Sequence, residues 1–288
     1  MWSEICKAIS KSTQEEFVLQ HRHSLGGGCI NQAYKLVGEG RSYFVKVNDA
    51  SCLDMFVAEA EGLREILETN TILVPRPICY GVAGSQSYLV LEHLELGGGS
   101  SQSWQMMGKK LAQLHKCRKE TRFGWKMNNT IGSTPQINDW CDNWADFFAK
   151  RRIGYQLQLA YRRGANFDNI TKIVEKIRDC LRDRQPHPSP LHGDLWGGNA
   201  SFTLDGTPVI FDPAFYYGDR EADIAMTELF GGFSPAFYQA YNQEYPLDNG
   251  YQQRKLIYNL YHILNHFNLF GGGYLSQAKS MISKIMAF

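Results

Sequence analysis

Residues 191–199 read Leu-His-Gly-Asp-Leu-Trp-Gly-Gly-Asn, the most informative segment of the chain. This segment places Asp194 and Asn199 five residues apart in a loop that contains three glycines. A β-prone run, Pro-Val-Ile-Phe-Asp at 208–212, follows and ends in a second carboxylate, Asp212. Asp and Asn in glycine-rich loops are common turn residues when they occur singly. It is therefore the combination of all three oxygen-bearing side chains at this spacing that indicates a functional site.

The spacing His-x-Asp-x4-Asn, followed by a strand that ends in Asp, is typical of enzymes that transfer a phosphoryl group. In that chemistry one carboxylate accepts the proton of the attacking hydroxyl. An amide oxygen and a second carboxylate hold Mg²⁺ against the phosphates of ATP. We therefore predict Asp194 as the catalytic base, Asn199 and Asp212 as metal ligands, and ATP and Mg²⁺ as cofactors. His192 is predicted to be structural.

The N-terminal half offers a glycine-rich turn and a strand lysine for nucleotide binding. Gly27 and Gly28 could bring backbone N–H groups close to phosphate, although a plain hairpin loop would look similar. Lys46 lies in a strand-like run one hairpin later, where kinases carry a lysine that contacts the α- and β-phosphates. The next helix should supply its ion-pair partner. We predict Glu59, at the edge of the apolar face, with Glu61 as the alternative.

The adenine base is predicted to lie at Glu92, His93 and Leu94, where a strand ends just before Gly97-Gly98-Gly99. An ordinary strand end would contain similar residues, so the prediction rests on their position within the whole pattern.

The chain divides into two regions with different patterns of apolar residues. Short strand-like runs with glycine turns occupy residues 17–47 and recur near 79–80 and 88–91, which is typical of an antiparallel meander. After residue 99 the apolar spacing becomes helical, at 104–117, 140–161, 170–181, 224–230 and 251–267. We predict an α+β, bilobal, protein-kinase-like fold. A small antiparallel-sheet lobe in residues 1–95 would bind nucleotide, and a larger, mainly helical lobe in residues 96–288 would carry the catalytic and substrate groups.

Composition excludes several classes of function. Thirty basic and 29 acidic residues leave a net charge of +1 without a basic block, which argues against nucleic-acid binding. The chain lacks a signal-peptide pattern and any run of about 18 apolar residues, so no membrane association is expected. Seven cysteines, odd in number and without a Cys-x-x-Cys pair, indicate reduced thiols and a cytoplasmic protein.

Residues 192–199 resemble the signature of the fructosamine (ketosamine) kinase family, relatives of the aminoglycoside and choline kinases. The resemblance covers essentially the full chain and includes residues 27–31, 129–138, 212–223 and 226–233. Many small-molecule kinases share the His-Gly-Asp part, whereas Leu195-Trp196 and the Asn-Thr-Ile-Gly run at 129–132 are more specific. Asp219 departs from the family pattern, in which His is usual, and no catalytic role depends on it.

The resemblance implies phosphorylation of the sugar 3-hydroxyl of ketosamines, the fructosamine and ribulosamine adducts of free or protein-bound lysine. The 3-phosphate is unstable and releases the amine, which amounts to deglycation. Trp196 is the candidate substrate wall, because an indole stacks on a sugar ring or attracts an ammonium; a core role fits it equally well. Asp223 is expected to fix the catalytic loop.

The resemblance also implies a candidate redox switch at Cys29. Family members with a cysteine in this loop can form disulfide-linked dimers, so we expect a monomer or a redox-dependent homodimer. A thiol beside loop N–H groups that attract phosphate would also be more acidic than usual. A small, inert loop residue is the alternative.

Two other functions compete with a ketosamine kinase. One is a kinase for an aminoglycoside, choline or another amino alcohol, which the nearly neutral composition and Leu195-Trp196 disfavour. The other is an inactive nucleotide-binding scaffold. Such a protein typically loses its base or a metal ligand, whereas Lys46, Asp194, Asn199 and Asp212 are all present.

Overall fold

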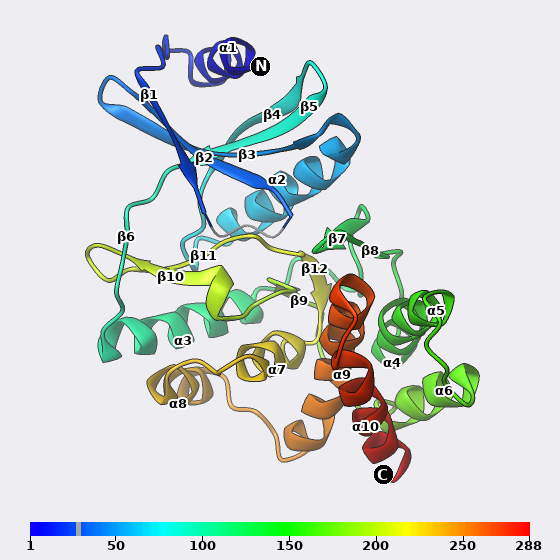
Figure 1. Cartoon of the computed structure of the whole chain (residues 1–288). Helices are drawn as coiled ribbons and strands as arrows, with labels where there is room; N and C mark the ends of the chain where they lie inside the picture. Colours follow the sequence, from blue (N-terminus) through cyan, green and yellow to red (C-terminus); the bar gives the residue numbers. More distant parts are fainter. Residues whose placement is uncertain (27–29) are drawn as a thin grey trace.

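The computed structural model describes residues 1–26 and 30–288, which form a small sheet-containing lobe and a larger helical lobe (Figure 1). The N-terminal sheet has the order β1-β2-β3-β5-β4, and every neighbouring pair is antiparallel. Its strands are β1 (His21–Leu25), β2 (Gln32–Gly38), β3 (Arg41–Asp49), β4 (Pro77–Ala83) and β5 (Gln86–Glu92). The predicted meander and fold class are confirmed.

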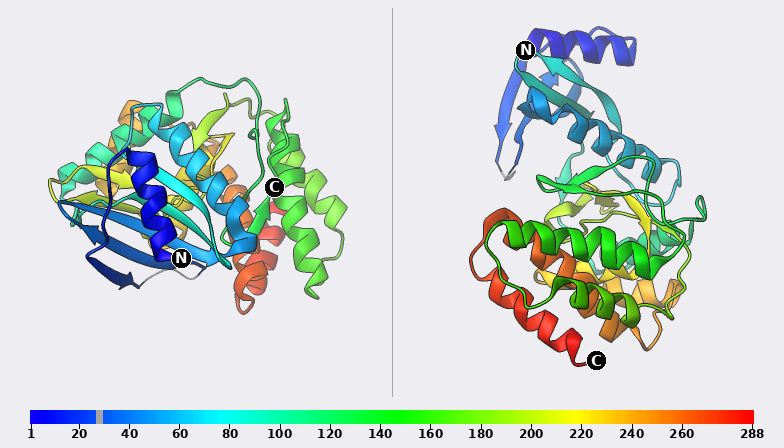
Figure 2. Two further views of the ribbon diagram at one scale, coloured as in Figure 1. Left: turned by 90° about the horizontal axis from the view of Figure 1, so that it is seen from above. Right: turned by 90° about the vertical axis from the view of Figure 1, so that its right-hand side faces the viewer.

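Alternation along β3 gives the sheet two different faces, because successive strand side chains point to opposite sides. Val45 and Val47 are buried in one cluster with Ile5 and Ile9 of α1 (Trp2–Thr13), which covers the outer face. Lys46 points to the opposite face. There α2 (Leu53–Leu67), reached through the short 3-10 turn η1 (Ala50–Cys52), packs between the sheet and the helical lobe (Figure 2). Lys46 therefore faces the helix predicted to hold its partner.

The chain leaves this sheet after Glu92. The next strand, β6 (Leu96–Gly97), pairs with β10 (Ala200–Thr203) of the C-terminal part. Hydrogen bonding between strands thus changes from one lobe to the other within a few residues. The boundary between residues 95 and 96 stays a prediction.

Helices make up most of the C-terminal part. They are α3 (Ser101–Lys116), α4 (Trp144–Phe147), α5 (Tyr155–Arg162), α6 (Ile170–Cys180), α7 (Glu221–Leu229), α8 (Pro235–Glu244), α9 (Tyr251–Phe270) and α10 (Tyr274–Met286). The sequence did not predict α8 and α10. The helix predicted over 140–161 is present from Trp144 onward, so only its start is wrong. Asn143 caps α4 by accepting a hydrogen bond from the N–H of Asp146, so the helix begins at Trp144, and a π-helical segment, η2 (Phe148–Gly154), interrupts it.

Three small antiparallel pairings order the loops between these helices. β7 (Asn129–Ile131) and β8 (Thr134–Gln136) form a hairpin, β9 (Ser189–Leu191) pairs with β12 (Tyr216–Gly218), and β10 pairs with β11 (Pro208–Ile210). As a result, the loop after β9 and the loop after β11 lie side by side below the N-terminal sheet (Figure 1).

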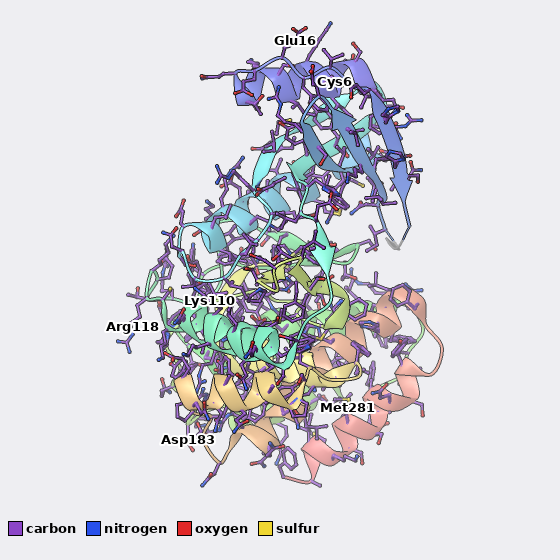
Figure 3. The ribbon with its side chains drawn as sticks, turned by 90° about the vertical axis from the view of Figure 1, so that its left-hand side faces the viewer. Cys6, Glu16, Lys110, Arg118, Asp183 and Met281 are labelled. Carbon is purple, nitrogen blue, oxygen red and sulfur yellow. The ribbon has the colours of Figure 1, made fainter. Side chains whose placement is uncertain are left out.

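The termini lie at opposite ends of the molecule (Figure 2). Cys6 and Glu16 mark the outer end of the N-terminal lobe, and Asp183 and Met281 lie toward the far end of the helical lobe (Figure 3). None of the helices in residues 1–26 and 30–288 combines the length and the apolar character that a membrane span requires.

Candidate active site

The loop at residues 192–199 is held from behind by a buried carboxylate. Asp223, in the first turn of α7, accepts hydrogen bonds from the backbone N–H groups of His192 (2.7 Å) and Gly193 (2.8 Å). Its Oδ2 also lies 3.2 Å from Nε2 of His115 on α3. The loop-fixing role predicted for Asp223 agrees with these contacts.

His192 and Gly193 join this loop to the segment that follows β11. Nε2 of His192 donates to the carbonyl oxygen of Phe211 (2.8 Å), and Nδ1 accepts from the N–H of Asp194 (3.2 Å). Burial lowers the pKa of His192, which favours the neutral ring that this pairing needs. Gly193 has a φ of +81°, and a Cβ there would lie 2.1 Å from the carbonyl oxygen of Ala214. Only glycine fits, so the two loops pack backbone to backbone.

Asp194 is half-buried and only partly satisfied. Asn199 donates through Nδ2 to the backbone oxygen of Asp194 (2.9 Å) and to its Oδ2 (3.2 Å). Within residues 1–26 and 30–288, no hydrogen bond reaches Oδ1 of Asp194. Burial, together with the charge of Asp212, raises the pKa of Asp194 to about 7. The carboxylate thus has a free oxygen and a proton affinity near neutral pH, both of which suit a general base.

The donor chemistry of Asn199 and Asp212 fits a nucleotide-bound magnesium ion. Because Nδ2 of Asn199 is engaged with Asp194, its Oδ1 remains as an oxygen ligand. The Asp212 side chain is 45% exposed, and its backbone has a φ of +60°, unusual for a residue other than glycine. In the described part of the chain, no cluster of three or more His, Cys, Asp or Glu could hold a metal alone. Mg²⁺ on ATP needs few protein ligands, since phosphates and water complete its shell.

Lys46 joins the two lobes at this point. Its Nζ donates to Glu59 of α2 (2.7 Å) and to Oδ1 of Asp212 (2.6 Å). Burial alone would lower the pKa of Lys46, but the negative charges of Asp212 and Glu59 outweigh that effect and raise it, so the side chain stays an ammonium. Glu61, the alternative partner, instead contacts Arg64 and Lys126.

The structure describes only some of the remaining residues that we predict to bind nucleotide. Gly27, Gly28 and Cys29 lie outside the described residues. Glu92 ends β5, and its N–H donates to the carbonyl oxygen of Arg76 (2.8 Å). In the described part of the chain, no hydrogen bond engages the backbone N–H or C=O of His93 or Leu94. These groups are therefore available to a base in the linker.

Trp196 lies at the surface, with 39% of its area exposed. Its ring centroid is 6.5 Å from that of Phe230, which in turn lies 4.6 Å from that of His266. A core role therefore does not fit Trp196. The sequence did not point to the extension of this aromatic surface, because Phe230 and His266 are far from Trp196 along the chain.

Comparison with known proteins agrees with this geometry. The family model described as "Fructosamine kinase" matches residues 1–288. The chain is 55% identical, over 285 residues, to a "Probable ketoamine kinase" of Synechocystis, and the match covers 99% of this chain and 97% of the relative.

Two solved structures show the same architecture. A crystal structure from Haemophilus somnus, provisionally assigned as a fructosamine-3-kinase, has a TM-score of 0.94 at 37% identity and covers 99% of this chain and 98% of its own. The choline kinase LicA from Streptococcus pneumoniae has a TM-score of 0.67 at 15% identity, with coverage of 100% and 99%, and shows the shared fold alone.

Proposed function

The chain belongs to the fructosamine kinase family, and from that premise we propose that it transfers the γ-phosphate of ATP to the sugar 3-hydroxyl of ketosamines. The observation that carries this proposal is the convergence of Asp194, Asn199, Asp212 and Lys46, from both lobes, around a carboxylate oxygen that has no partner in the described residues. The enzyme is thus an ATP-dependent phosphotransferase with an alcohol group as acceptor.

Asp194 is the proposed general base. Its free Oδ1 accepts the proton of the sugar hydroxyl as the hydroxyl oxygen forms a bond to the γ-phosphorus. The bond between that phosphorus and the bridging β,γ-oxygen breaks, and ADP leaves with the bonding electron pair. A pKa of about 7 matches the proton affinity of Asp194 to this task near neutral pH.

Asn199 and Asp212 are the proposed ligands of Mg²⁺, which when bound neutralises charge on the ATP phosphates. Lys46 would contact the α- and β-phosphates while Glu59 orients it. Both carboxylates that now contact Lys46 would then keep its ammonium charged and in place.

The rest of the nucleotide is assigned to the turn and the linker. The backbone of Gly27 and Gly28 would cover the phosphates. Glu92, His93 and Leu94 would bind adenine, a proposal supported by the unpaired backbone groups of His93 and Leu94 in the described chain.

Trp196 is the proposed wall of the substrate site. An exposed indole two residues after the base can stack on a sugar ring or attract the ammonium of a substrate amine. Trp196→Leu should raise KM for the ketosamine more than KM for ATP. Equal changes in both constants would argue for a purely structural role.

One assay tests the whole proposal. The purified protein is incubated with Mg-ATP and a panel of ribulosamines, fructosamines, choline and aminoglycosides, and ADP release is compared with later release of free amine. Turnover of a ketosamine followed by free amine is the expected result. Activity on choline or kanamycin alone would favour the amino-alcohol kinase, and no activity on any acceptor would favour the scaffold.

Regulation through Cys29 is a separate proposal, which rests on the family resemblance. In the reducing cytoplasm, our proposed compartment, the protein would be a monomer. Oxidation would link two copies through Cys29, and activity should fall under peroxide and return with dithiothreitol. Cys29→Ala is compared with Cys117→Ala, because burial raises the pKa of Cys117 and disfavours its reactive thiolate. If Cys29→Ala is still inactivated and dimerised like wild type, Cys29 is not the switch.

A further inference from the structure

The β7–β8 hairpin contacts the segment that carries Asp212. Gln136 donates through Nε2 to the carbonyl oxygen of Ala214 (3.0 Å), and Asn129 donates through Nδ2 to that of Phe215 (2.8 Å). Both amides are buried and face each other across the hairpin, where Asn129 pairs with Gln136. Two side chains from one hairpin therefore bind consecutive carbonyl groups just after Asp212.

Further contacts fix the direction of these amides. Oδ1 of Asn129 accepts from Gln136 (2.9 Å) and from Nδ2 of Asn138 (2.8 Å), so its Nδ2 must point toward Phe215. Oε1 of Gln136 accepts from the hydroxyl of Tyr261 on α9 (2.7 Å). Neither amide can rotate by 180° without losing these partners.

Arg152 hydrogen-bonds to Asn138, the residue that in turn contacts Asn129. From the π-helical segment it donates to Oδ1 of Asn138 (2.7 Å) and to the carbonyl oxygen of Ile137 (2.5 Å). It is fully buried, and among the described residues no carboxylate lies within salt-bridge distance. Its guanidinium instead lies over the ring of Tyr216, 4.1 Å from the centroid. A buried cation without a counter-ion is costly, and the hydrogen bonds to Asn138 and Ile137 offset part of that cost.

The segment contacted in this way needs support. A non-glycine residue with the φ of Asp212 (+60°) is strained and persists only where its surroundings fix it. The carbonyl oxygen of Ala214 lies between Gln136 on one side and the closely packed Gly193 on the other. A shift of that carbonyl would disturb the catalytic loop and Asp212 together.

We propose that Asn129, Gln136, Asn138 and Arg152 form a hydrogen-bonded network, called the relay below, that positions Asp212 for the Mg-nucleotide complex. These are positioning residues, since they act through the carbonyl groups of Ala214 and Phe215. The inference rests on the proposed function, in which Asp212 binds the metal. It adds that the affinity for Mg-nucleotide depends on a hairpin whose contacts with the metal-site segment are made through Asn129 and Gln136.

The test measures nucleotide affinity directly. Binding of ADP to the full-length protein is followed by calorimetry with and without Mg²⁺, and the melting temperature is recorded for each variant. Gln136→Leu removes the donor to Ala214, and Arg152→Lys keeps a cation but loses the planar fork. Both are expected to weaken Mg-ADP binding about 10- to 100-fold, the usual effect of removing a partner behind a metal ligand. Binding of ADP without Mg²⁺ should change far less.

Asn268→Leu is the matched control. Asn268 is a buried amide of α9 whose side chain bonds to Gln156 and not to the relay. It should lower the melting temperature as Gln136→Leu does, with Mg-ADP affinity unchanged. Equal Mg-ADP affinity in Gln136→Leu and Asn268→Leu would overturn the relay.

If Gln136→Leu does not fold, Asn129→Asp serves the same purpose, because it keeps the shape but loses the donor to Phe215. Wild-type affinity for Mg-ADP in that variant would equally overturn the relay. A wild-type protein that binds Mg-ADP but phosphorylates no ketosamine would refute the proposed substrate and leave the relay to be judged on binding. A wild-type protein that does not bind Mg-ADP would refute both.

Discussion

The carboxylates around the catalytic loop fall into two pairs with opposite environments. Asp194 and Asp212, which we call the front pair, are incompletely buried and each has few partners. Asp219 and Asp223, behind the loop, are fully buried and saturated. Asp219, for example, accepts hydrogen bonds from the guanidinium of Arg184, from the hydroxyl of Tyr258 (2.8 Å) and from the N–H of Glu221.

The pKa values of Asp194 and Asp223 shift in opposite directions as a result. At Asp194, burial is not offset by enough donors, and the pKa rises. At Asp223, burial alone would also raise the pKa, but hydrogen bonding and charge from His115 and the loop N–H groups lower it. Spare oxygens are what a base and a metal ligand require, and saturated oxygens are what a stable scaffold requires. Function and stability are thus assigned to different carboxylates, although Asp223 binds the N–H of Gly193, the residue next to Asp194.

The largest effect is expected at Asp194, on the rate of turnover. Asp194→Asn keeps the shape of the side chain but removes its basic oxygen, so turnover should fall roughly 10²- to 10⁴-fold. Affinity for Mg-ADP should stay close to wild type, and the variant should be no less stable than wild type. Steady-state ADP release and calorimetry measure these quantities, with Asp168→Asn, at an exposed loop position, as the control. Turnover within about threefold of wild type would rule out Asp194 as the base.

A change at the rear should reduce both stability and activity. Asp223→Ala leaves the N–H groups of His192 and Gly193 without their acceptor and removes the charged partner of His115. Breaking a buried, charged network of this kind costs about 3–5 kcal/mol of unfolding free energy. Urea unfolding followed by circular dichroism would show the loss, and Asp168→Ala should change it by no more than about 0.5 kcal/mol. An Asp223→Ala protein as stable as wild type would mean that the loop does not depend on this carboxylate.

Loss of Asp212, the other front carboxylate, should affect nucleotide affinity more than stability. Asp212→Ala removes the proposed anionic ligand of the metal, and we expect Mg-ADP binding to weaken about 100-fold, or roughly 2.8 kcal/mol, at least as much as in the relay variants. Lys46 keeps Glu59 as a partner, so the lysine should remain charged. Calorimetry at several Mg²⁺ concentrations provides the measurement. Unchanged affinity would show that Asp212 is not a ligand.

How much of this arrangement could be predicted from the sequence depends on the distance over which each contact acts. Lys46 and Glu59 could be paired because strand alternation and helix periodicity each give a face, and the two elements are consecutive. The loop 192–199 could be identified because its groups are close together in the chain. Fold class followed from the change in periodicity near residue 99.

The contacts that were not predicted join segments far apart in sequence. Gln136 bonds to the carbonyl of Ala214, 78 residues away, and Tyr261 orients Gln136 from 125 residues away. No periodicity encodes such pairs, and a buried Gln in a short strand reads as an ordinary polar residue. Asp219 was seen only as a departure from the family pattern. Its bond to Arg184 of the loop after α6 gave no sequence signal.

The smallest expected effect is a change of folding stability with pH, which should have opposite signs for Asp194 and Asp223. In the folded chain the pKa of Asp223 lies below its ordinary value, so the unfolded chain binds more protons in acid. Its contribution to stability is present above a pH of about 4 and is lost as pH falls through the depressed folded pKa. The pKa of Asp194 is raised to about 7, so the folded chain holds a proton there that the unfolded chain has released. Its ionisation therefore lowers stability as pH rises from about 4 toward 8.

Two matched substitutions in metal-free buffer test this difference. Relative to wild type, Asp223→Asn should be most destabilising at pH 7 and above, with the deficit shrinking as the pH falls below about 4. Asp194→Asn should be most favourable at pH 8, where it removes an ionised, poorly solvated carboxylate, and the gain should vanish near pH 4. Urea midpoints measured for both variants and wild type between pH 3.5 and 8 would give difference curves of opposite sign at neutral pH. Curves of the same sign would mean that the two carboxylates share one environment, and the assignment of chemistry to the front pair and support to the rear pair would fail.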